Sequence, residues 1–301
     1  MIKKLLQEKN SVSEDVIAIT DKIYSEICDD FEKTETFLSK TYGFQEVKEN
    51  IIRVSLTDID ERLGNLTVRY TVYLAEKDDD IKTMEKFLRE KANSQYDDET
   101  GVMTIATIFQ NGNFVPDTEG IIYHEVTHFY QYRLGMEKRV SLYGKMHDYI
   151  DAGDDNVDAY YVALALYYTF PHEQDAFAHE FYSLLLKNNG DLDIEKYEHY
   201  RWAKYASNIV KRHYKGDNDM VNTIKDLGYS VKDYFLRLHY GLKRFERKLT
   251  NVLIRYEVDQ KEKEMTIEQR VKRNIKIGCK YLTEGKEYFF PKRKYEHFFE
   301  F

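Results

Sequence analysis

Three residues near the middle of the chain have types and a spacing suited to binding a metal ion. His124 and His128 are four positions apart in TEGIIYHEVTHFYQYRLG, residues 118 to 135. In a helix, positions four apart differ by only about 40°, so both imidazoles project from one face and can hold one ion. Glu125 lies one step round the helix, close to a water on the metal but poorly placed as a third ligand. This is the H-E-x-x-H arrangement, in which zinc acidifies water and the glutamate takes its proton.

The surroundings of this motif favour a helix that carries a site. With 9 histidines in 301 residues, the pattern is improbable by chance. Asp117 and Thr118 can serve as N-cap residues, and Gly135 is suited to end the helix. The alternative is a structural helix with two histidines in a polar cluster and a glutamate on the surface. We expect the zinc site, with His124, Glu125 and His128 as its residues.

The elements before this helix alternate between helical and extended patterns. Helical spacing predicts one long helix or two over residues 12 to 41, and a further helix at about 81 to 92. Strands are expected at 51 to 56, 65 to 76 and 102 to 110. The second of these alternates apolar and polar residues, which predicts a half-buried strand with one buried face: Leu66, Val68, Tyr70, Val72 and Leu74.

Helices are expected in most of the chain after the motif. A polar loop leads to residues 158 to 170, which are apolar nearly all round and predict a buried helix under the site. Pro171 ends that helix and can begin the next one, at about 172 to 187. Residues 190 to 270 look helical, and residues 275 to 290 can form a hairpin. One stripe of the helical part contains His199, Trp202, Tyr205 and Ile209.

The motif and the order of elements together resemble a known superfamily. The order of elements is helix, two strands, helix, strand and a His-bearing helix. This order is similar to that in the N-terminal half of the zincin metallopeptidases, over about residues 45 to 188. The resemblance implies an α+β fold with a small mixed sheet over the zinc-binding helix and a mainly α-helical C-terminal part. It also implies peptide-bond hydrolysis, with extended substrate pairing to a strand at the sheet edge. Val102–Gln110 is the candidate for that edge, although a purely structural strand fits equally well.

A catalytic zinc site normally has three protein ligands, so one remains to be found. The extended metzincin pattern is excluded because Gln131 and Leu134 stand where it needs Gly and His. Glu173 and Ala176 fit the E-x-x-A signature of glutamate-zincins, and the small Ala176 lets the two helices approach closely. Glu173 is therefore the expected third ligand. The alternatives are as follows: His172, His179, His147, Asp148 and Asp151.

Two further roles are assigned on the same basis. Glu180, seven positions after Glu173, returns to its face and can accept the other N–H of a zinc imidazole, unless it is a partly exposed helix glutamate. An oxyanion donor is harder to choose, because the chain has 26 tyrosines. The shortlist for that donor consists of His147, Tyr161, His179 and Tyr182.

Charge and composition suggest three parts and limit the partners. Residues 1 to 189 carry 20 Lys and Arg against 35 Asp and Glu, whereas residues 190 to 301 carry 25 against 18. We expect an N-terminal helical segment (1–44), a zincin-like metallopeptidase domain (45–189) and a helical, basic C-terminal part (190–301). The basic helices lack a base-reading motif, so nucleic acid is not an expected partner. They cover the surface, dock on the acidic part or bind an acidic protein partner.

The remaining features concern location and function. The N-terminus lacks a secretory h-region and no apolar run is long enough to span a bilayer, so we expect a cytoplasmic protein with reduced Cys28 and Cys279. The leading interpretation is a zinc metallopeptidase acting on protein or peptide substrates, with Glu125 as general base. The runner-up is a catalytically inactive zincin-fold structural or interaction protein in a larger assembly. A third possibility is hydrolysis of a non-protein amide, such as a cell-wall peptide.

Overall fold

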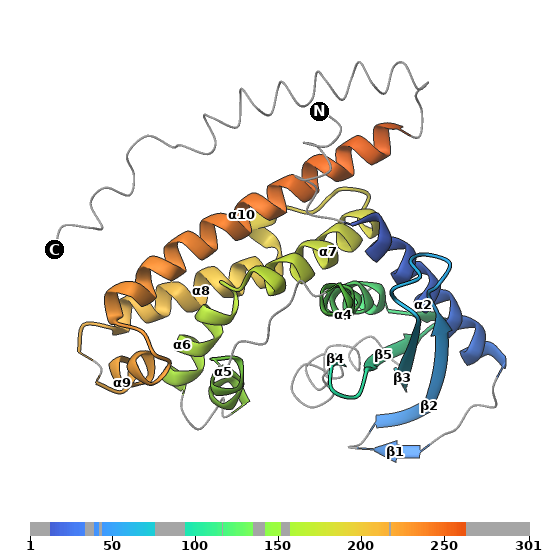
Figure 1. Cartoon of the computed structure of the whole chain (residues 1–301), viewed down its shortest axis with the longest axis horizontal. Helices are drawn as coiled ribbons and strands as arrows, with labels where there is room; N and C mark the ends of the chain where they lie inside the picture. Colours follow the sequence, from blue (N-terminus) through green and yellow to red (C-terminus); the bar gives the residue numbers. More distant parts are fainter. Residues whose placement is uncertain are drawn as a thin grey trace. The chain divides into compact units, whose positions relative to one another are not determined.

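A mixed sheet and a set of helices make up the described part of the chain (Figure 1). The computed structural model describes residues 13–33, 39–41, 44–75, 94–115, 117–134, 142–151, 157–216 and 218–262. The chain divides into two compact units, Met1–Leu253 and Ile254–Phe301. The predicted boundaries near residues 44 and 189 stay predictions.

The sheet has both parallel and antiparallel neighbours. Its strands follow the order β1-β2-β3-β5-β4 across the sheet, and β6 pairs with β5. The only parallel pair in this described sheet is β3 with β5, which a helical crossover or another long connection must join. The strand bounds are β1 Ser39–Thr41, β2 Phe44–Ser55, β3 Asn65–Leu74, β4 Gln95–Asp97, β5 Val102–Gln110 and β6 Asn113–Phe114.

One face of the sheet is covered by helices α2 (Glu14–Lys33) and α4 (Asp117–Arg133). The alternation in β3 confirms the predicted buried face over Leu66, Val68, Tyr70 and Val72, which are fully buried, but at its end Tyr73 is buried and Leu74 only half-buried. The core between sheet and helices also contains Ile19 and Ile23 of α2 and Val126 and Phe129 of α4. Burying these side chains stabilises the fold by roughly 1.5–3 kcal/mol each. The core therefore fixes α4 against one face of the sheet.

The rest of the described chain is helical. Its elements are α5 (Leu142–Asp151), α6 (Val157–Tyr167), α7 (Pro171–Lys187), the 3-10 helix η2 (Ile194–Lys196), α8 (Glu198–His213), α9 (Asn218–Asp226) and α10 (Val231–Glu262). The predicted fold class is confirmed at this level: the protein is α+β, with a small mixed sheet and a mostly helical remainder. Pro171 begins α7 at its first turn, as predicted from its fixed φ.

Helix α7 lies between α4 and α10 (Figure 1). On the α10 side, the Arg244 guanidinium donates to Gln174 Oε1 at 2.9 Å and to the Thr169 carbonyl at 2.5 Å. Lys248 forms an ion pair with Asp175 and donates to the Pro171 carbonyl at 3.0 Å. Two basic residues of α10 thus bind the start of α7.

Two predictions of local structure are wrong. The helix expected to reach residue 41 ends at Lys33, and Ser39–Thr41 forms β1 instead, because pairing with β2 satisfies its backbone groups. The loop expected after the motif contains α5, in which Met146 is fully buried. Helical spacing of apolar residues was present there but was interrupted by polar ones. The helix at 81–92 and the hairpin at 275–290 lie outside the described residues.

The predicted sheet edge is also wrong, because β5 is not an edge strand. On its outer side, Val102–Thr104 pairs with β4, and Phe109 and Gln110 pair with β6. Between them, the Ala106 N–H donates to Ser94 Oγ at 3.0 Å. A three-residue strand such as β4 is too short to show alternation in the sequence, so it escaped prediction. In the described part of the sheet, β4 forms the edge on this side.

Helix α8 buries only Ile209 of the stripe noted in the sequence. Trp202 and Tyr205 are 39% and 46% exposed. The buried residues of α8 include three small ones, which allow close packing on α6: Tyr200, Ala203, Ala206, Ser207, Ile209 and Val210. Among the described helices, none is long and apolar enough to cross a membrane.

Candidate metal centre

The site lies where α4 and α7 pack side by side in antiparallel directions. Gly120 of α4 is next to Glu180 of α7, while His128, two turns later, is next to Glu173. A Cβ atom added to Gly120 would lie 3.4 Å from Glu180 Cγ, and Ala176 is fully buried. These two small residues allow the helices to approach closely, as the E-x-x-A pattern predicts for Ala176.

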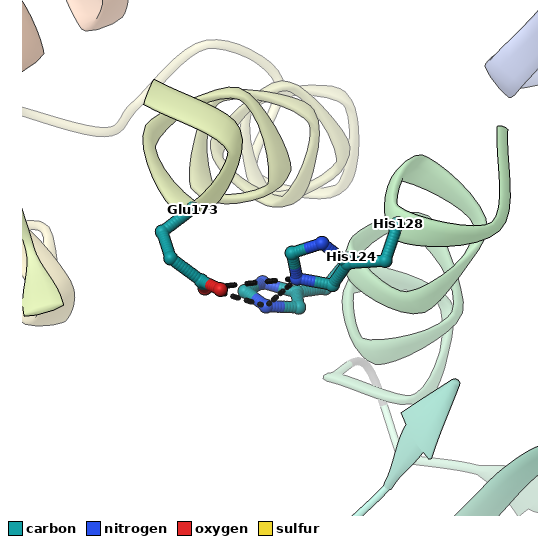
Figure 2. Close-up of side chains that lie close together, drawn as sticks. All are labelled: His124, His128 and Glu173. Atoms are coloured by element: carbon teal, nitrogen blue, oxygen red, sulfur yellow. Dashed lines mark hydrogen bonds and ion pairs between the residues drawn. The ribbon is translucent and has the colours of Figure 1, made fainter. Parts of the chain in front are cut away.

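Three side chains from the two helices converge on one point (Figure 2). His124 and His128 project from α4, and Glu173 projects from the first turn of α7. The Nε2 atoms of the two histidines are 3.2 Å apart. Glu173 Oε2 is 3.7 Å from His124 Nε2 and 3.6 Å from His128 Nε2. The predicted ligand atoms therefore form a nearly regular triangle.

The triangle fits a tetrahedrally coordinated cation. Bonds of about 2.0–2.2 Å to nitrogen and oxygen place neighbouring ligand atoms roughly 3.3–3.6 Å apart. The three separations here lie close to that range. Two imidazole nitrogens that face each other also repel through their lone pairs unless a proton or a cation lies between them. These three residues could hold a metal ion, and their geometry does not identify which one.

The electrostatics of the centre also suit a cation. Glu173 is 2% exposed. Burial alone would raise the pKa of Glu173, but the charge of His128 and hydrogen bonds with both histidines lower it to about 2. Burial alone would lower the pKa of His124, but its contacts with Glu173 and Glu180 raise it to about 10. The surrounding carboxylates thus favour positive charge at the point where the three side chains meet.

Glu125 lies beside the triangle and is held from the sheet. Its side chain is buried, and its Oε2 atom accepts the backbone N–H of Tyr96 in β4 at 2.8 Å. Burial raises the pKa of Glu125, against the charges of His124 and His128. A carboxylate with a raised pKa is a stronger base than an exposed one. The edge strand thus fixes one oxygen of the predicted general base.

Glu180 has the position that the sequence predicts for a partner of the histidines. Its Oε2 atom lies 3.4 Å from His124 Nδ1, the ring nitrogen that faces away from the triangle. Burial alone would raise the pKa of Glu180, but His199 and His124 lower it to about 2. Glu180 is therefore a carboxylate and can accept the Nδ1–H of His124, which leaves Nε2 free to bind an ion.

Tyr167 is a residue of the site that sequence reasoning missed. Its hydroxyl donates to Glu173 Oε2 at 2.5 Å, the oxygen that also faces both histidines. Tyr167 is the last residue of α6, and the turn before Pro171 returns it to the start of α7. The signal in the sequence was its place one turn before a helix-breaking proline, but 26 tyrosines concealed it.

The other candidates lie in several places. His172 is near the centre, with Nε2 3.5 Å from Glu173 Oε1. His179 is engaged elsewhere, because Nε2 accepts the Ser13 N–H at 2.9 Å and Nδ1 faces the Asp175 carbonyl at 2.8 Å. Among the remaining alternatives, Asp148 is exposed on α5, Tyr182 is buried in α7, and Tyr161 packs against Tyr205. The side chains of His147 and Asp151 lie outside the described residues.

Comparisons of this chain with protein-family models, curated proteins and solved structures found no match. The interpretation of the centre therefore depends on the geometry of its own residues.

Proposed function

We propose that this protein is a zinc-dependent peptidase of zincin type. In this proposal His124, His128 and Glu173 hold the ion, and Glu125 is the general base. The observation that carries it is the triangle of two imidazole nitrogens and one carboxylate oxygen, with the Glu125 carboxylate beside it. When bound, zinc supplies Lewis acidity that polarises a carbonyl and allows water to be deprotonated near neutral pH.

Glu125 moves the proton in this reaction. Because Tyr96 N–H occupies Oε2, the Oε1 atom accepts the proton of the attacking water. The raised pKa of Glu125 makes the transfer more favourable and lets the protonated acid persist until it donates to the leaving amine. The role needs a carboxylate, since an amide can neither accept nor return that proton.

Tyr167 has the chemistry of an electrophilic partner. Its hydroxyl is a hydrogen-bond donor that reaches the ligand triangle, where negative charge develops on the carbonyl oxygen of a substrate. We assign it this role in place of the four residues shortlisted from the sequence. The same hydrogen bond fixes the orientation of the Glu173 carboxylate before substrate binds.

The substrate side of the centre is assigned to β4 instead of β5. Strand β4 is the sheet edge that contacts Glu125 through Tyr96. Since the Tyr96 N–H is used by Glu125, an extended peptide can pair with the Tyr96 carbonyl but not with its N–H. A polypeptide bound along this edge would pass next to the general base.

A structural zinc site is the competing proposal. Such sites normally have four protein ligands and no place for water. Among the described residues, the cluster of suitable ligands has three members, which favours an open fourth position. Burial lowers the pKa of neighbouring His172 to about 4, so its ring is neutral, and it is the residue from which a fourth ligand would come.

Metal analysis and spectroscopy distinguish these two proposals. We expect one zinc ion per chain, which chelators remove. One of its coordination positions should be open to water or to a small anion. Cobalt substitution should give an absorption spectrum that changes when a hydroxamate or another small zinc-binding anion is added. A cobalt spectrum that is unaffected by such anions, and that is altered by His172→Ala, would instead show a closed four-ligand site.

A further inference from the structure

Contacts of the centre extend beyond α4 and α7 to the first turn of α8. His199 Nε2 lies 2.9 Å from Glu180 Oε1, while the other oxygen of Glu180 faces His124. His199 Nδ1 lies 3.4 Å from the hydroxyl of Tyr168. Four side chains, those of Tyr168, His199, Glu180 and His124, thus form a line from the turn after α6 to the predicted metal ligand.

The chemistry of these groups decides which atom donates in each contact, and both ends of the line donate toward Glu180. A carboxylate only accepts hydrogen bonds, so His199 donates its Nε2–H to Glu180 and has an acceptor at Nδ1 when neutral. The Tyr168 hydroxyl, whose pKa burial raises well above its usual value, keeps its proton and can donate it to that nitrogen. On the other side, Glu180 accepts the Nδ1–H of His124. Each proton in the line has one donor and one acceptor.

Packing couples His199 and His124 by a second route. The His199 ring stacks on Phe177, with centroids 4.3 Å apart and planes 26° apart. Phe177 also lies against the His124 ring, with centroids 4.7 Å apart. Tyr197, just before α8, anchors this helix by donating to the Phe177 carbonyl at 3.1 Å. The position of His199 is therefore fixed on the same α7 turn that contacts His124.

We propose that His199 and Tyr168 are positioning residues, which act through Glu180 to hold the His124 ring with Nε2 directed at the metal. The inference rests on the proposed function and extends it, because it gives the helices after residue 189 a part in building the centre. Neither residue touches the metal ligands' triangle directly. Their effect is to limit rotation of the His124 ring and to fix its tautomer.

Zinc affinity in a double-mutant cycle tests this role. Glu180→Gln should weaken zinc binding about 10- to 100-fold, as expected for a direct partner of a ligand. His199→Phe, which retains the stacking on Phe177, should weaken it by a smaller factor of about 3 to 10. In the Glu180→Gln background, His199→Phe should have no further effect, because the line is already broken.

Two controls separate this role from general destabilisation. His213→Phe makes the same change at an exposed position of the same helix and should leave zinc affinity unaltered. His199→Gln has an amide N–H that can replace Nε2–H and should recover most of the lost affinity. Unchanged affinity in His199→Phe, or an equal loss in both backgrounds of the cycle, would overturn the inference.

A metal-independent measurement makes the two proposals separable. In metal-free protein with ¹⁵N-labelled histidine, the Nδ1 proton of His124 should exchange slowly and give a downfield signal. That signal should disappear in Glu180→Gln and shift in His199→Phe. If the unmodified protein binds no zinc, the proposed function fails, and the proton spectrum still decides whether the line exists. A His124 signal unaffected by His199→Phe overturns the inference even when zinc binds.

Discussion

Three elements determine the state and position of Glu173, and each has a different consequence for the centre. His124 and His128 of α4 lower its pKa, Tyr167 of α6 orients one oxygen, and the first turn of α7 sets its backbone. No periodic pattern in the sequence encodes the contact with Tyr167, because it depends on the turn between two helices. The ligand set is thus more predictable than the groups that orient it.

At the residue scale, Glu173→Ala should reduce zinc occupancy nearly as much as His128→Ala, since each change leaves two protein ligands. Glu180→Ala should reduce it less, because Glu180 contacts a ligand and not the ion. Glu195→Ala, at an exposed position of η2, is the matched control. Metal content after dialysis against a weak chelator measures the effect. Full occupancy in Glu173→Ala would remove this residue from the ligand set.

The role of Tyr167 gives a second prediction at this scale. Tyr167→Phe should lower kcat about 100-fold while one zinc per chain is retained, since a donor to developing negative charge is lost. Tyr160→Phe removes a hydroxyl from the same helix and should have little effect. Steady-state kinetics on a cleaved peptide give the comparison. Equal kcat values for both variants would show that Tyr167 only orients Glu173.

At the element scale, most long periodic segments were predicted well and short or interrupted ones were not; β2 begins at Phe44, seven residues before its predicted start. Strand β5 begins and ends where the sequence indicated, and α4 and α7 agree within a few residues. Strand β4 and helix α5 were missed, because three residues show no alternation and a mixed polar segment hides helical spacing. The contact of Tyr96 with Glu125 therefore could not be foreseen.

Helix α10 is packed directly on the turn that leads to Glu173. A Cβ atom at Gly241 would lie 2.6 Å from the Thr169 side chain, so Gly241→Ala must separate the two elements. We expect a loss of about 1–3 kcal/mol in the free energy of unfolding, together with weaker zinc binding. Gly216→Ala is the control, since its Cβ meets no atom within 4 Å. If Gly241→Ala leaves stability and zinc affinity unaltered, the packing of α10 on this turn does not support the metal centre.

The buried ring of His179, which accepts the N–H of Ser13 just before α2, makes stability depend on pH. Burial lowers the pKa of His179 to about 4, so the folded state binds fewer protons than the unfolded state between that value and about 6.5. The free energy of unfolding should therefore fall as the pH falls through this range, by about 3 kcal/mol at most. In His179→Gln, whose amide can still accept the Ser13 N–H, the free energy of unfolding should fall less steeply. Denaturation of metal-free protein at several pH values tests this, and parallel curves would contradict it.

At the scale of the whole molecule, the sequence indicated the α+β class and the convergence of His124, His128 and Glu173. It placed a boundary near residue 189 and offered docking of the basic helices on the acidic part as one alternative, and Arg244 and Lys248 do bind the segment next to Glu173. Contacts between residues about 70 positions apart are not visible in local periodicity. The centre is therefore a product of the sheet, α4, α6, α7, α8 and α10 together.

The central claim is that this protein hydrolyses peptide bonds with Glu125 as general base. The most direct measurement is cleavage of a broad peptide library by the unmodified, Glu125→Gln and His124→Ala proteins, with zinc content determined for each. We predict turnover by the unmodified protein, and zinc retained with turnover lowered by orders of magnitude in Glu125→Gln. Loss of both is predicted for His124→Ala. Equal cleavage by the unmodified and Glu125→Gln proteins, or none by zinc-loaded unmodified protein, would contradict the account.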